Sequence, residues 1–146
     1  MFYFSANFYH RKLPIDKATL LWLDFYIMKR DKILIIISDR TLRQLYHELF
    51  VHEELEVTMA ESIGEALVLL TLHKYSSIIL YEDDEIETKT FLRLKHRRRQ
   101  WFQIPLLILT PEPNVFATSV TKKDILFNSL YIHPSEIVEI IKTLLI

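Results

Sequence analysis

Short aliphatic runs separated by stretches with helical spacing recur along the chain from residue 32 onward. The first run, residues 33–37, reads Ile-Leu-Ile-Ile-Ile. Such a continuous, β-branched run is typical of a strand that is covered on both faces in a parallel sheet. Further runs at residues 55–59, 76–81, 104–109 and 125–132 predict four more strands.

Between these runs, apolar residues recur at intervals of three and four, which predicts helices with one apolar face. The expected helices cover residues 42–50, 62–72, 88–101, 115–123 and 135–146. Asp39 or Thr41 can cap the first helix, and Ser62 with Glu65 three residues later matches a capping box. Because strands and helices alternate and such crossovers are right-handed, we expect a three-layer α/β/α sandwich around a parallel sheet.

Composition excludes several classes of function. The only glycine among the 146 residues is Gly64, which leaves no glycine-rich cradle for nucleotide phosphates. Cysteine is absent, so disulfides and thiolate metal sites are excluded, and we expect a cytoplasmic protein. Lys and Arg total 18 against 19 Asp and Glu, which gives no global attraction to nucleic acid. No apolar stretch reaches the roughly 20 residues that a membrane span needs.

Polar residues follow the predicted strands where a parallel sheet places its working edge. These residues are Ser38, Asp39, Glu82, Asp83, Thr110 and His133. The six histidines lack metal-binding spacing and no serine lies in a nucleophile elbow, so we expect a binding module and not an enzyme.

The segments that carry these residues resemble the receiver domain of two-component response regulators, a flavodoxin-like fold. Residues 34–39, LIIISD, are similar to the first strand of the family, and residues 76–82, SSIILYE, to the third. Residues 104–110, IPLLILT, resemble the fourth strand with its switch threonine, and residues 131–134, YIHP, the fifth, which normally ends in Lys-Pro. The resemblance covers roughly four fifths of the chain and implies a five-stranded sheet in the order 2-1-3-4-5.

Three positions depart from the pattern that the resemblance implies. Glu82 stands where the family has its phosphoacceptor aspartate, and its longer side chain can reach the place of the outer phosphoryl oxygens. Ser38 replaces one carboxylate of the metal-binding pair, which leaves Asp39 and Glu82 as a weak Mg²⁺ site. His133 replaces the lysine, and an imidazole is mostly neutral at pH 7.

These departures predict an atypical receiver that works in signal transduction as a phosphorylation-independent interaction module. The expected contact surface includes Leu130, Tyr131 and Pro134, and the expected partner is another protein or a second copy of the chain. A one-residue shift of the alignment keeps a second function open, a working phosphoacceptor that uses Asp83 or Glu82 with Mg²⁺.

Two further segments stand out. The basic run from Lys95 to Arg99 precedes Trp101, and Arg97 to Arg99 keep nucleic-acid binding as a third function. The solvated end of a helix explains the run better, because cations suit the helix dipole there. Residues 1–30 are rich in aromatic residues and are expected to form a partly helical extension to a domain at residues 31–146.

Overall fold

The computed structural model describes residues 16–19 and 32–144. Two compact units divide the chain, Met1–Arg30 and Asp31–Ile146, and the second unit contains the whole sheet. The aromatic positions of the predicted N-terminal extension lie outside the described residues. Within residues 16–19 and 32–144, no helix combines the length and hydrophobicity that crossing a bilayer requires.

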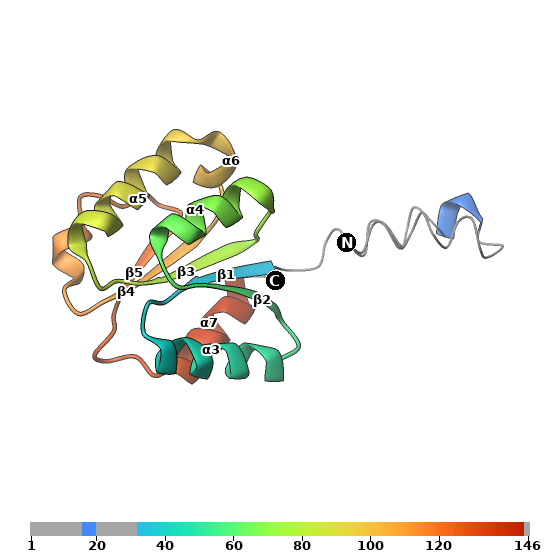
Figure 1. The fold of residues 1–146 in the computed structure, drawn as a ribbon, viewed down its shortest axis with the longest axis horizontal. Helices are drawn as coiled ribbons and strands as arrows, with labels where there is room; N and C mark the ends of the chain where they lie inside the picture. Colours follow the sequence, from blue (N-terminus) through green and yellow to red (C-terminus); the bar gives the residue numbers. More distant parts are fainter. Residues whose placement is uncertain (1–15, 20–31, 145–146) are drawn as a thin grey trace. The chain divides into compact units, whose positions relative to one another are not determined.

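Five parallel strands form one sheet in the second unit (Figure 1). The strands are β1 (Lys32–Ile36), β2 (Glu56–Ala60), β3 (Ser77–Tyr81), β4 (Leu106–Thr110) and β5 (Asp124–Asn128). Their spatial order is β2-β1-β3-β4-β5, which confirms the predicted order. The central strands are almost fully buried, as expected for β-branched and leucine-rich runs covered on both faces.

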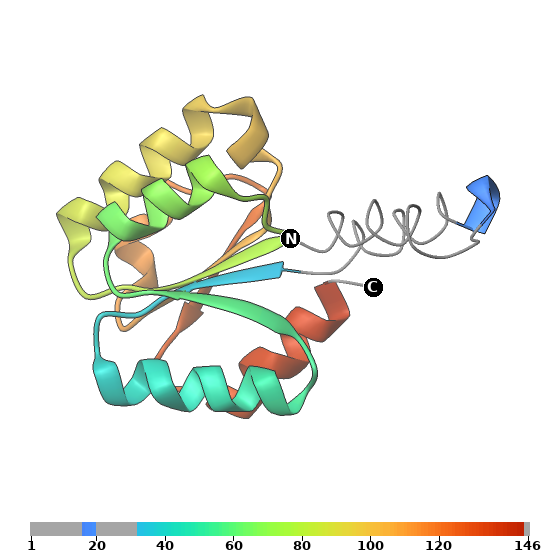
Figure 2. The same ribbon diagram turned by 45° about the vertical axis from the view of Figure 1, so that its right-hand side comes forward.

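Helices cover both faces of the sheet (Figures 1 and 2). One layer contains α4 (Ile63–Leu72), α5 (Glu85–Arg97) and α6 (Arg99–Phe102), and the other contains α3 (Arg40–His52) and α7 (Pro134–Leu144). Successive strand residues alternate between the layers, so that Ile78 and Leu80 pack in the α4–α5 core and Ile79 in the α3–α7 core. The predicted three-layer α/β/α sandwich is confirmed.

Short polar side chains fix where three helices begin. The Asp39 Oδ1 atom accepts the Leu42 amide at 2.8 Å and starts α3, and Ser62 Oγ accepts the Glu65 amide at 3.1 Å and starts α4. Both predicted caps are confirmed. Asp84 caps α5 in the same way, with Oδ1 2.9 Å from the Glu87 amide. Each cap satisfies a backbone N–H that the helix itself leaves unpaired.

The structure corrects the bounds of three predicted elements. The helix expected at residues 115–123 is a single 3₁₀ turn, η1 (Pro113–Phe116). The fifth strand, expected at residues 125–132, ends at Asn128, because the Asn128 side chain accepts the Leu130 amide at 3.0 Å and turns the chain. The helix expected at residues 88–101 is divided at Arg98, whose backbone is extended.

Candidate functional site

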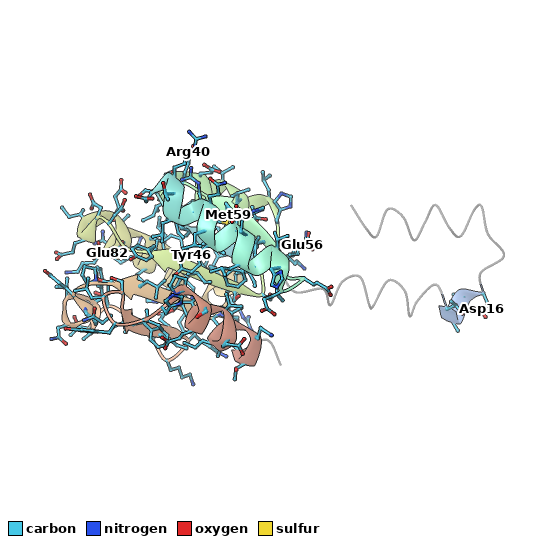
Figure 3. The ribbon with its side chains drawn as sticks, turned by 90° about the horizontal axis from the view of Figure 1, so that it is seen from below. Asp16, Arg40, Tyr46, Glu56, Met59 and Glu82 are labelled. Carbon is cyan, nitrogen blue, oxygen red and sulfur yellow. The ribbon has the colours of Figure 1, made fainter. Side chains whose placement is uncertain are left out.

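The carboxyl ends of β1, β3 and β4 bring five of the six predicted site residues to one edge of the sheet. Ser38 and Asp39 follow β1, Glu82 and Asp83 follow β3, and Thr110 is the last residue of β4. Figure 3 shows Glu82 at the end of the sheet opposite Glu56, the first residue of β2. We call this edge, from Ser38 to Thr110, the carboxyl rim.

A direct hydrogen bond joins β3 and β4 at the centre of the carboxyl rim. Strand register places Tyr81 beside Leu109, so the next residues, Glu82 and Thr110, are also neighbours. The Thr110 hydroxyl donates to Glu82 Oε1 at 3.0 Å and accepts the Glu112 amide at 3.1 Å. Because Thr110 is fully buried and its oxygen already accepts one N–H, its hydroxyl proton is directed at the carboxylate.

The other acidic side chains of the rim have partners of their own. Ser38 Oγ donates to Asp83 Oδ2, while Asp39 caps α3. The Arg43 guanidinium donates to the carbonyl oxygens of Ile37 at 2.9 Å and Ser38 at 3.1 Å. A positive group from α3 therefore holds the loop that carries Ser38.

The acidic side chains of the rim form no cluster of metal ligands. Among residues 16–19 and 32–144, no three His, Asp or Glu side chains converge as metal ligands would. Magnesium needs hard oxygen ligands in near-ideal octahedral geometry. The carboxylates of Asp39, Glu82 and Asp83 are instead bonded to an amide and two hydroxyls. The weak Mg²⁺ site at Asp39 and Glu82 stays a prediction.

No protein family model and no curated protein matches the chain. Solved structures do match it. The chemotaxis response regulator CheY4 of Vibrio cholerae is 18% identical with a TM-score of 0.65, and the match covers 78% of this chain and 98% of CheY4. The signal receiver domain of a signal transduction histidine kinase from Syntrophus aciditrophicus is 16% identical with a TM-score of 0.66, and the match covers 79% of this chain and 89% of that one.

A response regulator from Chloroflexus aurantiacus is 19% identical with a TM-score of 0.66, over 79% of this chain and 97% of its own. Each match extends over most of the residues of both chains. The chain has the receiver-domain fold. At such low identity, the likeness concerns the fold, and the chemistry of the rim has to be derived from the residues present.

The receiver fold also shows which residue ends the fifth strand. The prediction that His133 occupies this position is wrong, because β5 ends at Asn128, which pairs with Thr110. His133 is exposed and lies in the loop before α7, where its Nδ1 atom is 2.8 Å from Ser135 Oγ. The strand end where the resemblance places a lysine therefore carries a neutral amide.

The predicted contact surface lies beside the carboxyl rim. Leu130 and Tyr131 are 72% and 83% exposed, while Pro134 is half-buried at the start of α7. The Ser129 amide donates to the Thr110 carbonyl at 3.0 Å. Leu130 and Tyr131 therefore come directly after Ser129 in the chain, and Ser129 is bonded to Thr110.

The sequence did not predict the buried ionic cluster at the opposite edge of the sheet. Lys95 was assigned to a solvated helix end, yet its side chain is fully buried, 3.3 Å from Asp124 Oδ1. Asp124 Oδ2 also accepts the Thr121 amide at 2.8 Å and lies 2.8 Å from His96 Nε2. The position of Lys95 among the apolar residues Phe91 and Leu92, on the inner face of α5, is the signal that could have revealed it.

Burial and hydrogen bonding act in opposite directions in this cluster. Burial lowers the pKa of Lys95, against the attraction of Asp124. For Asp124, burial acts to raise the pKa, but the hydrogen bonds from Thr121 and His96 and the Lys95 charge outweigh it, and the pKa is lowered. The contact between Lys95 and Asp124 joins the end of α5 to the start of β5.

Proposed function

We propose that residues 32–144 act in signal transduction as a receiver-type interaction module that does not depend on phosphorylation. The hydrogen bond from Thr110 to Glu82 is the observation that supports this function. In the receiver family, to which the resemblance points, this threonine is the switch residue beside the phosphoacceptor. The Glu82 carboxylate accepts the hydrogen bond of the threonine hydroxyl. It thereby supplies a negatively charged oxygen at the place where a phosphoryl group would otherwise supply it.

The charges of the described residues around Glu82 support the same proposal. Phosphoryl transfer requires a bound divalent cation and a cation that stabilises the resulting anion. Asn128 ends β5 without a charge, and Arg43 is bonded to backbone carbonyls at the other side of the rim. The module is expected to bind a protein partner through the surface that includes Leu130 and Tyr131.

Treatment of the full chain with acetyl phosphate and Mg²⁺ tests the proposal. Intact-mass measurement should show no phosphoryl adduct, and beryllofluoride with Mg²⁺ should leave the amide resonances of Glu112 and Ser129 unchanged. Glu82→Ala should shift both resonances, because it removes the acceptor of the Thr110 hydroxyl. Glu48→Ala, at an exposed site on α3, is the matched control and should shift neither.

An adduct would support the rival function, a working phosphoacceptor. Peptide mapping would then distinguish Glu82 from Asp83, whose carboxylate is bonded to Ser38. A stable adduct on either residue would contradict the proposed function. Nucleic-acid binding by the exposed residues Arg97 and Arg99 has less support, because Lys95, the first residue of that basic run, is buried in an ion pair.

A further inference from the structure

A groove of about 680 Å³ opens at the amino ends of β3 and β4, between the end of α4 and α6. Apolar residues line much of it, including Leu70, Tyr75, Trp101, Ile104 and Pro105. Its polar lining residues are Thr71, His73, Lys74, Ser76, Gln100 and Gln103. Acidic residues do not occur among the residues that line it, so the groove suits an apolar segment that carries negative charge.

Basic residues surround this groove. Lys74 is exposed in its lining, and the guanidinium of Arg98 lies 4.5 Å from the centre of the Trp101 ring. Lys122 and Lys123 are exposed just before β5, at the same edge of the sheet. Because no carboxylate among the lining residues balances these positive charges, this edge attracts a negatively charged partner.

A segment of the required chemistry lies at the other edge of the same layer. Ile86 is 76% exposed in the first turn of α5, between the exposed residues Glu85 and Glu87. The groove includes Tyr75 and Ser76, immediately before β3, whereas the acidic segment follows β3. Figures 1 and 2 show the start of α5 and the ends of α4 and α6 at opposite ends of this layer.

We propose that the groove binds the first turn of α5, residues 85–87, of a second copy of this chain. Ile86 enters the apolar groove, while Glu85 and Glu87 face Lys74 and Arg98. Since the two surfaces differ and lie at opposite edges of the sheet, copies associate head to tail. This association does not rest on the Glu82–Thr110 contact, so the two proposals can fail separately.

The burial of the aromatic residues favours a protein segment over single-stranded nucleic acid. Bases bind by stacking on open aromatic faces. Trp101 and Tyr75 are 6% and 7% exposed, and Arg98 covers the Trp101 ring. The rings form the floor of a groove that accepts an aliphatic side chain, but they offer no free face of the size of a base.

Sedimentation velocity of the full chain over a series of protein concentrations tests the inference. We expect reversible self-association that weakens as salt is raised, because the contact joins exposed charges. The variant K74E/R98E reverses the charge of the groove, and I86D removes the apolar contact. Each should lower the association constant by about tenfold or more. R93E, at an exposed position of α5 outside the groove, is the matched control and should associate as the unaltered chain does.

A mixture of the two variants provides the decisive measurement. The intact groove of I86D can receive the intact segment of K74E/R98E, so an equimolar mixture should form a dimer that cannot grow further. A chain that stays monomeric at every concentration would overturn the inference, as would association that K74E/R98E leaves unchanged. Binding of a labelled single-stranded oligonucleotide that K74E/R98E abolishes, without self-association, would overturn it in favour of nucleic acid.

Discussion

The side chain of Thr110 is the residue on which the carboxyl rim depends most. It is fully buried, donates to Glu82 and accepts from the Glu112 amide, so a single hydroxyl connects the end of β4 to the loop after β3. Valine has nearly the same shape but cannot form either bond. Replacement of Thr110 by valine therefore removes its hydrogen bonds and keeps the volume of its side chain.

Thr110→Val is expected to lower the free energy of unfolding by about 1–3 kcal/mol, because it leaves the Glu82 carboxylate and the Glu112 amide without their partner. Urea denaturation measures the change. Thr110→Ser keeps the hydroxyl and should lose less stability than the valine variant. Equal stability of the valine variant and the unaltered chain would show that water replaces the hydroxyl.

Asp124 determines an acid-sensitive part of the stability. Its pKa in the folded chain lies below the ordinary value of 3.8, so its ionised form stabilises the fold above pH 3.8. That contribution is lost as the pH falls through the lowered folded-state pKa. We expect Asp124→Asn to lower the free energy of unfolding at pH 7 by about 3–5 kcal/mol, because Lys95 then remains buried without its counter-charge.

Urea denaturation at a series of pH values between neutral and acidic measures this contribution. The decline in stability below pH 3.8 should be shallower in Asp124→Asn than in the unaltered chain. Glu48→Gln, at an exposed carboxylate, should leave both the neutral value and the slope unchanged. A variant that keeps the steep acid decline would show that another carboxylate causes it.

At the scale of the elements, capping residues decide where two helices of one layer begin. Ser62 and Asp84 each accept the amide three residues later, at the starts of α4 and α5. Replacing either by alanine should lower the free energy of unfolding by about 1 kcal/mol. Thermal unfolding followed by circular dichroism measures the loss, with Thr71→Ala at an exposed site near the end of α4 as a comparison.

The periodic parts of the chain were predictable from sequence, and the irregular parts were not. Aliphatic runs and helical stripes indicate the five strands and both helical layers, because burial on two faces demands them. The order of the strands came from the family resemblance, and the sheet has that order. The end of β5 was missed because the aliphatic character of the chain continues to Ile132, while the Asn128 side chain ends the strand. That one difference moves His133 away from the rim.

The partners of polar side chains were also beyond sequence reasoning. Glu82, Asp83 and Thr110 were expected at one edge, since parallel strands end together. Which hydroxyl bonds which carboxylate depends on strand register, which pairs Tyr81 with Leu109 and was not predictable from the runs alone. Lys95 was predicted to be solvated because the basic run was interpreted as one exposed helix end. A helix directs consecutive side chains to different faces, and Lys95 lies on the buried face.

At the scale of the whole molecule, the sheet and both cores lie within the unit Asp31–Ile146. A chain that begins at Met28 is expected to keep a cooperative unfolding transition, because it retains every strand and both apolar clusters. Differential scanning calorimetry of this chain and of the intact one measures the effect. Loss of the transition in the shorter chain would show that residues before Met28 are needed for folding.

Under the proposed function, the contact between Glu82 and Thr110 has a consequence for control in time. A phosphoryl group on a receiver is removed by hydrolysis, whereas a glutamate side chain is as durable as the polypeptide itself. A signal carried by this bond would persist until the molecule is degraded. The strength of the output would then follow copy number, and its duration would be set by protein turnover.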